Sequence, residues 1–379
     1  MIEYSNKFRF GSNVWGGVFD FLNSGGKSFL YPKLIIKKYK KKPSQFLSSI
    51  LNNNCGIQSM PKALIIGTSN LSELRQVFDN NEILCLGGLG DAIQCKKLGI
   101  PYISNYTLTK NLYNCWFNCD IEKFNKLIKF TSNILNENNI KKVVVSNDSL
   151  PLERLIIYSA RDLSIKTFCI QHGLFSRKIP DINDGKYADI ILCYDIYQRQ
   201  ILLDSGSTNP ISIGYPFTSL SQSSCQDRKS LLFFGQPWSR YYSDKHDAYI
   251  SVVGNIKKLC EEFGINFKYK PHPSETIIAN GVIDKSSLDK SDLQSTLDKH
   301  FMFCSISSTA LLQASLLGKL VFQIYDQFFL DERYQDFGYC YSISIQDKYK
   351  FLELIRFGMP LKLPSDNKRI HRLKEVLRG

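Results

Sequence analysis

The chain has 379 residues, enough for two domains of ordinary size, and its 43% hydrophobic and 22% charged residues exclude wholesale disorder. The formal net charge of +13 favours an anionic partner: phosphorylated small molecules, nucleic acid or an anionic membrane face. The 11 cysteines are scattered and form no CxxC pair, which is typical of reduced core thiols in a cytosolic protein. No apolar run follows the early charges or approaches the roughly 18 residues of a membrane span, so neither a signal peptide nor a span is predicted.

The first 59 residues fit no regular pattern, and they contain a strongly basic segment. Residues 31–42, YPKLIIKKYKKK, carry six lysines and no acidic residue. Such a run is either a solvated face or connector, or a patch that lies against an anionic membrane, where each nearby lysine contributes about 1 kcal/mol. Both interpretations stay open at this point.

From residue 62 onward, short apolar runs alternate with segments of helical periodicity. Strands are predicted at 62–67, 82–88, 140–148, 166–173, 188–195 and 210–216. Helices are predicted at 70–79, 150–165 and 196–204. Strands that alternate with helices indicate a parallel sheet covered on both faces.

The alternation stops at 217–229, a polar, serine-rich stretch that we interpret as a linker, and then restarts. Strands are predicted at 230–237, 265–273, 301–307 and 319–324, and helices at 244–263, 286–300 and 308–318, with a basic helical stretch at 366–379. The predicted fold class is therefore α/β, with two Rossmann-like domains whose parallel sheets face a cleft. The N-terminal domain is expected to span 1–216 and the C-terminal domain 230–379.

Ligands of open α/β sheets bind outside the carboxyl ends of the strands, so polar residues just past strand ends are the candidates for function. The first such group is Lys270-Pro271-His272-Pro273. Two prolines fix the backbone on either side of one imidazole, which suits a phosphate contact or a proton donor. The alternative is an ordinary turn, although a turn needs neither two prolines nor an adjacent lysine.

A second group, Ser307-Ser308-Thr309, precedes the predicted helix 308–318. Serine and threonine are preferred N-caps, and a helix N-terminus offers unpaired N–H groups to an anion, although a plain N-cap explains the same residues. Because this group lies one strand–helix unit after His272, both loops should open on one edge of the sheet as a phosphate clamp. Gln236, after strand 230–237, is a third candidate, for a base or the reacting group; a strand-ending turn is the alternative.

In the first half, Asp148 follows strand 140–148 and is the candidate general base, with Glu153 as the alternative. His172 ends the next strand and either acts in catalysis or orders the cleft by hydrogen bonding. The run Gly87-Gly88-Leu89-Gly90 ends another strand but lacks the GxGxxG spacing of a dinucleotide loop.

Several chemistries are absent from the sequence. It has no GxxxxGK[ST] loop, no DxD, no HExxH and no GxSxG, and its five histidines are dispersed. Its basic segments lack the aromatic residues of an RNA-binding sheet. No metal site, no cofactor and no nucleic-acid partner are therefore predicted.

Together, the His272-Pro273 and Ser307-Ser308-Thr309 motifs resemble those of GT-B type glycosyltransferases of bacterial surface polysaccharides, especially sialyltransferases and Kdo transferases that use CMP-activated sugars. The resemblance spans about residues 140–325 at the level of short motifs. It implies that both motifs bind the nucleotide phosphate, with Gln236, Lys270 and Pro273 nearby, and that Asp148 is the base. The sialyltransferase base usually lies in an acidic-acidic-Gly motif, whereas this chain has Asn147-Asp148-Ser149 and only Asp184-Gly185 as a remnant.

The implied activity is transfer of an acidic sugar, of sialic acid or Kdo type, from a CMP-activated donor to a glycan or lipid-linked acceptor in capsule, O-antigen or lipooligosaccharide synthesis. The expected enzyme needs no metal and is cytoplasmic or peripheral at the inner face of the cell membrane. The stretch from Gln171-His172-Gly173 to Gly214-Tyr215-Pro216 also resembles CDP-glycerol glycerophosphotransferases, so a CDP-polyol phosphotransferase is an alternative. A polysaccharide-assembly protein that binds without catalysis is another.

Overall fold

The structure is a computed structural model, and it describes residues 62–118, 121–148, 150–177, 187–207, 209–216, 227–238, 243–273, 275, 282–363 and 368–379. The basic segment 31–42, most of the predicted linker 217–229, and Asp184-Gly185 lie outside the described residues. Among the described residues, no helix is both long and apolar enough to cross a bilayer.

Contacts within the chain divide it into two compact units, which are described separately. Unit 1 comprises Met1–His172, Asp181–Pro216 and Lys368–Gly379, and unit 2 comprises Gly173–Pro180 and Phe217–Asn367. The division at Pro216 falls where the predicted linker begins. The sequence, however, predicts a C-terminal domain that runs to residue 379 and an N-terminal domain without a break.

The end of the chain returns to unit 1 because it completes the hydrophobic core there. Leu373 and Leu377 of α15 (Arg369–Arg378) are fully buried in the core of the first sheet. The buried guanidinium of Arg369 donates to both carboxylate oxygens of Glu73, at 2.7 and 2.8 Å, and to the carbonyl of Gly214. A C-terminal helix with these contacts cannot be assigned from the periodicity of its own sequence.

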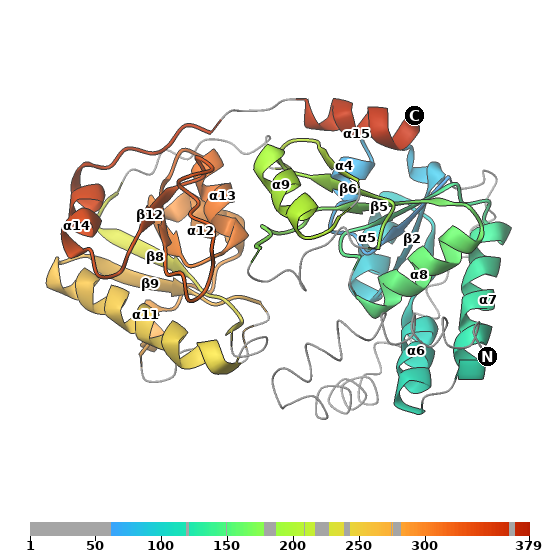
Figure 1. The fold of residues 1–379 in the computed structure, drawn as a ribbon, viewed down its shortest axis with the longest axis horizontal. Helices are drawn as coiled ribbons and strands as arrows, with labels where there is room; N and C mark the ends of the chain where they lie inside the picture. Colours follow the sequence, from blue (N-terminus) through green and yellow to red (C-terminus); the bar gives the residue numbers. More distant parts are fainter. Residues whose placement is uncertain are drawn as a thin grey trace. The chain divides into compact units, whose positions relative to one another are not determined.

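Within the described residues, unit 1 has a seven-stranded sheet with the order β3-β2-β1-β4-β5-β6-β7, all pairs parallel (Figure 1). The strands are β1 (Ala63–Ile66), β2 (Ile83–Gly87), β3 (Tyr102–Ser104), β4 (Lys142–Val145), β5 (Lys166–Ile170), β6 (Ile190–Cys193) and β7 (Pro210–Ser212). The chain starts in the middle at β1, builds outward to β3, and then crosses to β4 on the other side. The order therefore reverses between β1 and β4.

Helices cover this sheet and connect its strands. They are α4 (Leu71–Leu74), α5 (Leu89–Leu98), α6 (Tyr106–Asn118), α7 (Ile121–Glu137), α8 (Pro151–Asp162) and α9 (Ile196–Asp204), with the short 3-10 helix η1 (Asn80–Glu82). The predicted helix 70–79 is wrong in length, since only four residues are α-helical before a turn leads to η1. No prediction covered α5, β3, α6 or α7.

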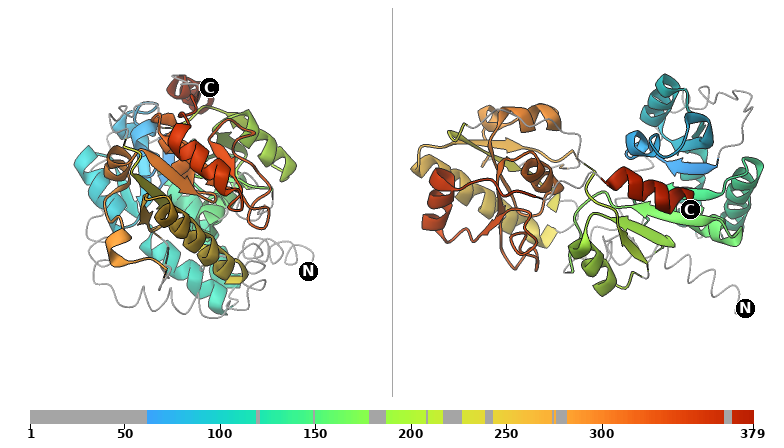
Figure 2. Two further views of the ribbon diagram at one scale, coloured as in Figure 1. Left: turned by 90° about the vertical axis from the view of Figure 1, so that its left-hand side faces the viewer. Right: turned by 90° about the horizontal axis from the view of Figure 1, so that it is seen from above.

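Unit 2 has a five-stranded sheet in its described part, with the order β12-β11-β10-β8-β9, again all parallel. The strands are β8 (Ser230–Phe234), β9 (Asn266–Lys270), β10 (Met302–Ser305), β11 (Leu320–Ile324) and β12 (Tyr341–Ile343). The helices are α11 (Ser243–Glu262), α12 (Leu293–Lys299), α13 (Thr309–Leu316), α14 (Lys348–Phe357) and the 3-10 helix η3 (Lys285–Ser287). Figure 2 shows this unit from two further sides.

The predicted helix 286–300 is also too long. Residues Lys285–Ser287 form η3, and α12 begins only at Leu293, after the N-cap Asp292, whose carboxylate accepts the N–H of Ser295 at 2.9 Å. An aspartate before a polar segment stops a helix from extending backwards, because its side chain replaces the missing carbonyl acceptor.

Candidate functional site

The sheet of unit 2 reverses its order between β8 and β10, the position where open α/β sheets bind ligands at their carboxyl edge. Three loops leave the sheet on this edge: the one at Gly235–Trp238 after β8, the one at Pro271–Pro273 after β9, and the one at Ile306–Ser308 after β10. The predicted candidates of the second half of the chain follow these three strands.

Gln236 joins the loop after β8 to the loop after β10, at the point where the strand order reverses. Its Oε1 accepts the backbone N–H of Ser307 at 3.0 Å and the hydroxyl of Ser305 at 3.4 Å, while its amide nitrogen donates to the Ser307 hydroxyl. Gln236 and Ser307 are both partly exposed, so the bridge lies at the surface of the edge. An amide and a hydroxyl held side by side are suited to hydrogen-bond an anionic oxygen.

A buried chain of hydrogen bonds connects the loop after β8 to the loop that carries His272. The N–H of Gln236 donates to the Tyr249 hydroxyl at 3.0 Å, and the hydroxyls of Tyr249 and Tyr269 are 2.7 Å apart. The Tyr269 hydroxyl donates to Oε1 of Glu275 at 2.6 Å, so the Tyr249 hydroxyl donates to Tyr269. The chain ends at Oε2 of Glu275, which accepts the backbone N–H of His272 at 3.0 Å.

This chain sets the backbone of His272 through a carboxylate that lies three residues later. Burial raises the pKa of Glu275, against the lowering effect of the Tyr269 and His272 hydrogen bonds. Burial also raises the pKa of both tyrosine hydroxyls, so both are donors at neutral pH. Sequence analysis missed Glu275, Tyr249 and Tyr269, although Glu275 follows the Pro271-His272-Pro273 turn closely.

Gly235 is required by the same cluster. A Cβ at this position would lie 2.5 Å from Oε2 of Glu275 and 2.5 Å from the Tyr269 hydroxyl oxygen. Contacts that short do not occur in folded proteins, so any side chain here would displace the carboxylate that holds His272.

The N-terminus of α13 is the third part of the edge. The Ser308 hydroxyl caps the helix by accepting the N–H of Ala310 at 3.3 Å. The Thr309 hydroxyl accepts the N–H of Leu174 at 3.0 Å. Leu174 belongs to Gly173–Pro180, the short segment after β5 that is part of unit 2. The buried Glu332 holds the same segment by accepting the Ser176 hydroxyl at 2.6 Å and the N–H of Arg177 at 2.7 Å. Ser308 and Thr309 thus have structural partners in addition to the predicted anion.

Lys270 and Pro273 differ in their surroundings. The Lys270 ammonium donates to the carbonyl of Ser291, in the loop before α12. Lys270 also helps to lower the pKa of Asp289, where hydrogen bonds from Ser291 overcome the opposite effect of burial. Pro273 is exposed at the end of the turn. The phosphate role of both residues stays a prediction.

In unit 1, Asp148 lies beyond the end of β4, beside the strand-order reversal, but its side chain is 0% exposed. Its Oδ2 accepts the backbone N–H groups of Tyr187 at 2.8 Å and Ala188 at 2.9 Å. The buried guanidinium of Arg154 lies 3.7 Å from the centre of the Tyr187 ring. Asp148 therefore holds the turn that leads into β6, and its assignment as general base stays a prediction.

The other first-half candidates are more accessible. His172 is exposed and is the last residue of unit 1 before the chain passes to unit 2, and Glu153 is partly exposed in the first turn of α8. Gln171, the residue before His172, is buried. Its Nε2 donates to Oε1 of Gln198 at 2.7 Å, and its Oε1 accepts the N–H of Tyr194 at 2.7 Å.

Asp91 is a carboxylate at the same edge of unit 1 that sequence analysis did not select. Its two oxygens accept the Thr68 hydroxyl at 2.7 Å and the N–H of Gly88 at 2.8 Å, so it joins the loops after β1 and β2. This contact explains Gly87, since a Cβ at that position would lie 2.5 Å from Oδ2 of Asp91. Among the described residues, no group of three or more His, Cys, Asp or Glu side chains is placed to hold a metal ion.

No family model and no curated protein matches the chain. Among solved structures, UDP-GlcNAc 2-epimerase from Methanocaldococcus jannaschii is 15% identical with a TM-score of 0.54, over 84% of this chain and 99% of that chain. The S. aureus MnaA–UDP co-structure is 14% identical with a TM-score of 0.59, over 84% of this chain and 97% of that chain. A putative UDP-N-acetylglucosamine 2-epimerase from Listeria monocytogenes is 11% identical, with a TM-score of 0.54 over 84% and 96% of the two chains.

At such low identity the likeness concerns the fold alone. Two parallel sheets with covering helices in one chain, together with these matches, confirm the predicted α/β class of two Rossmann-like units, the GT-B type. Of these three structures, one is of a UDP-sugar epimerase, one of a putative UDP-sugar epimerase and one of a complex with UDP, whereas the prediction named CMP-sugars.

Proposed function

We propose that the protein is a nucleotide-sugar-dependent glycosyltransferase that transfers an acidic sugar, of sialic acid or Kdo type, from a CMP-activated donor to a glycan or lipid-linked acceptor. The observation that carries the proposal is the Gln236–Ser307 bridge at the reversal point of unit 2, beside the N-terminus of α13. Open α/β sheets commonly bind phosphates at such an edge, where N–H groups and hydroxyls can meet the negative charge.

The roles follow from the chemistry of each group. Gln236, Ser307 and the start of α13 hold the phosphate and stabilise the charge that develops on it as the glycosidic bond breaks. His272, on a backbone fixed by Glu275, donates a hydrogen bond to the departing phosphate. No step in this scheme uses a metal ion, so EDTA should leave the rate unchanged.

The acceptor hydroxyl loses its proton to a carboxylate of unit 1. Asp148 and Glu153 remain the two candidates. Oδ2 of Asp148 already accepts two backbone N–H groups, so a base at this position would act through Oδ1. Glu153→Gln and Asp148→Asn proteins separate the two, because the true base variant loses turnover while it keeps nucleotide affinity.

A second candidate is epimerisation of a UDP-sugar, supported by the similarity of the fold to UDP-GlcNAc 2-epimerase from Methanocaldococcus jannaschii, with a TM-score of 0.54. The CDP-polyol phosphotransferase has the same phosphate requirement as the first proposal. One assay compares all three: purified protein is incubated with CMP-sialic acid, CMP-Kdo, CDP-glycerol and UDP-GlcNAc, with and without EDTA and with a lipid-linked acceptor.

Nucleotide release from a CMP-sugar supports the transferase, release from CDP-glycerol supports the phosphotransferase, and conversion of UDP-GlcNAc to its epimer without release supports the epimerase. A His272→Ala protein should lose turnover, while His371→Ala, at a histidine whose side chain is 70% exposed on α15, should keep it. Absence of any reaction with all four donors contradicts the enzymatic proposal.

A further inference from the structure

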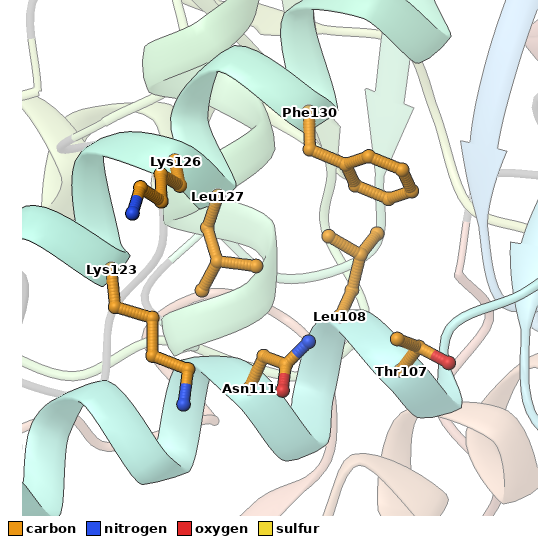
Figure 3. A pocket seen from close by; sticks show the side chains of 7 residues that line it. All are labelled: Thr107, Leu108, Asn111, Lys123, Lys126, Leu127 and Phe130. Atoms are coloured by element: carbon orange, nitrogen blue, oxygen red, sulfur yellow. The ribbon is translucent and has the colours of Figure 1, made fainter.

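Two features lie outside the groups that are proposed to touch the phosphate. The first is a surface hollow of about 300 Å³ on unit 1, between α6 and α7, where side chains such as Leu108 and Phe130 point toward one another (Figure 3). Its described lining residues include neither a carboxylate nor an imidazole. The second is Glu275 of unit 2, whose carboxylate is connected by hydrogen bonds to both loops of the candidate phosphate site.

Glu275 holds the backbone of His272 at two points. Its Oε2 accepts the His272 N–H at 3.0 Å, and its own N–H donates to the His272 carbonyl at 2.9 Å. The prolines on either side, Pro271 and Pro273, have no N–H, so His272 supplies the one backbone donor of these three residues. The position of the His272 backbone therefore depends on the carboxylate that accepts this donor.

The chain of hydrogen bonds has as many acceptors as donors only while Glu275 is ionised. Four hydrogens point along it, from the N–H groups of Gln236 and His272 and from the hydroxyls of Tyr249 and Tyr269. Four oxygens receive them, namely the two hydroxyl oxygens and the two carboxylate oxygens. A proton on the carboxyl group would be a fifth donor, and both ends of the chain are N–H groups that cannot accept it.

A protonated Glu275 therefore has to lose one of its two partners. The Tyr269 ring is fully buried and stacks on Phe233 with ring centres 5.9 Å apart, so its hydroxyl stays in place. His272 lies in a partly exposed turn, and its bond to the carboxylate is the longer of the two, at 3.0 Å against 2.6 Å. The His272 N–H is then the donor that leaves, because water can accept it.

We propose that Glu275 is a positioning residue for His272 and that it acts only as a carboxylate, so that acid releases the His272 turn and inactivates the site. Because it concerns the step at the departing phosphate, this role rests on the proposed function. It also assigns a purpose to a carboxylate that touches neither the phosphate nor the acceptor.

The groups around the carboxylate make Glu275 the member of the chain whose charge changes with pH. The described titratable groups that face it are the hydroxyls of Tyr269 on β9 and Tyr249 on α11, with the thiol of Cys304 on β10 behind Tyr249. Burial raises the pKa of all three, so they stay protonated and uncharged. Burial also raises the pKa of Glu275 above its ordinary 4.5, so the release should begin above that pH.

The His272 amide can be followed directly by NMR. Labelling with ¹⁵N-histidine gives one backbone amide signal for each of the five histidines, and the signal that is missing from His272→Gln belongs to His272. As the wild type is titrated from pH 8 to pH 4, the proton shift of this signal should move upfield with a midpoint above 4.5, because the charged acceptor is lost. In Glu275→Gln the signal should lack this step and stay near its acid position.

Turnover with CMP-sialic acid or CMP-Kdo is the second readout. Below the midpoint of the His272 signal, kcat of the wild type should fall about tenfold for each pH unit, because one proton is bound. Glu275→Gln should lower kcat about 100-fold with KM little changed, since Gln236 and Ser307 still hold the phosphate while His272 is displaced. A step that comes from the His272 imidazole itself would remain in Glu275→Gln and is thereby separated from the step of the carboxylate.

Two further variants keep the test specific. Tyr249→Phe removes the acceptor of the Gln236 N–H but leaves Glu275 with both of its donors, so Kd for CMP should rise while the His272 step remains. Glu353→Gln, at an exposed glutamate of α14, is the matched control and should behave as the wild type does in both readouts. Thermal unfolding confirms that each variant is folded at the pH of the measurement.

Two results overturn the positioning role: a His272 signal that keeps its position down to pH 4 or moves equally in Glu275→Gln, and a Glu275→Gln protein with the kcat and KM of the wild type. A His272 signal that titrates as expected, in a protein that releases no nucleotide at any pH, supports the release by acid and counts against the transferase instead.

Discussion

Two replacements of Gln236 separate its part in stability from its part in binding. The side chain makes three hydrogen bonds: Oε1 accepts the Ser307 N–H at 3.0 Å and the Ser305 hydroxyl at 3.4 Å, and the amide nitrogen donates to the Ser307 hydroxyl. Each such bond contributes about 0.5–1.5 kcal/mol net, and the bond at 3.4 Å contributes least. Gln236→Ala should therefore lower the free energy of unfolding by about 1–3 kcal/mol and also weaken nucleotide binding.

Gln236→Glu keeps the shape and the acceptors. The Ser307 hydroxyl can turn to donate to the carboxylate, which replaces the bond from the lost amide nitrogen. The Ser305 hydroxyl donates mainly to the Phe234 carbonyl at 2.8 Å and keeps that bond, so the free energy of unfolding should change by less than about 1 kcal/mol. A unit charge 4 Å from a phosphate charge costs about 4 kcal/mol at an effective dielectric constant of 20. Because Gln236 is partly exposed, we expect about half of that cost, which corresponds to about a thirtyfold rise in Kd for a nucleotide.

The measurements are urea unfolding and calorimetric titration with CMP, CDP and UDP. Gln346→Glu, at an exposed glutamine of unit 2, is the control for added negative charge and should bind like the wild type. Unchanged nucleotide affinity in Gln236→Glu would falsify the phosphate site at this edge. Unfolding of Gln236→Glu at much lower urea would instead show that the bridge, rather than the charge, accounts for lost binding.

Three further predictions concern buried charges. Burial raises the pKa of Glu275 above its ordinary 4.5, so the folded protein binds more protons there than the unfolded chain, and its contribution to stability falls as pH rises above about 4.5. In urea titrations between pH 4 and 7, the free energy of unfolding of the wild type should therefore fall relative to that of Glu275→Gln. Plots of unfolding free energy against pH that run parallel for the two proteins would contradict this. Asp148→Asn should cost about 1–3 kcal/mol, since a neutral amide oxygen accepts the two N–H groups more weakly than a carboxylate oxygen does, and a wild-type unfolding midpoint would argue against the structural role. Arg369→Met leaves Glu73 without its partner and should cost about 3–5 kcal/mol in chemical unfolding, and Glu73→Gln in the same protein should recover part of it.

Most strands of the two sheets were predictable, above all the central ones that are buried along their length. β2, β8 and β11 are continuous apolar runs, which is how strands of covered parallel sheets read in sequence. β3 and β12 were not found, whereas β7, which is equally short, was found because it opens the longer run 210–216. The periodicity of its own sequence predicted α15 as a helix, but periodicity does not report which unit a helix packs against, and the prediction left α15 in the C-terminal domain.

Part of the candidate site was also predictable, because the carboxyl edge of a parallel sheet collects the residues that follow each strand. That rule selected Gln236, His272 and Ser307 without knowledge of which strands are neighbours. It did not select Tyr249 or Tyr269, since one lies within α11 and the other within β9. Their hydroxyls meet only after the sheet and its helix have packed, so no spacing in the sequence reports them.

Contacts distant in sequence also change how single residues of the site should be understood. From the sequence, Thr309 is expected to offer its hydroxyl to an anion at the start of a helix. In the structure this hydroxyl accepts the N–H of Leu174, 135 residues earlier. A hydroxyl that accepts one N–H still carries its own hydrogen, and the direction of that hydrogen is now limited by Leu174. Glu332 fixes the same segment through Ser176 and Arg177, so the orientation of the donor at the start of α13 depends on a carboxylate beyond β11. The candidate anion site of unit 2 is therefore shaped by a piece of chain that follows β5 of unit 1 in sequence. Its motifs can be recognised in the sequence, but the contacts that orient them cannot.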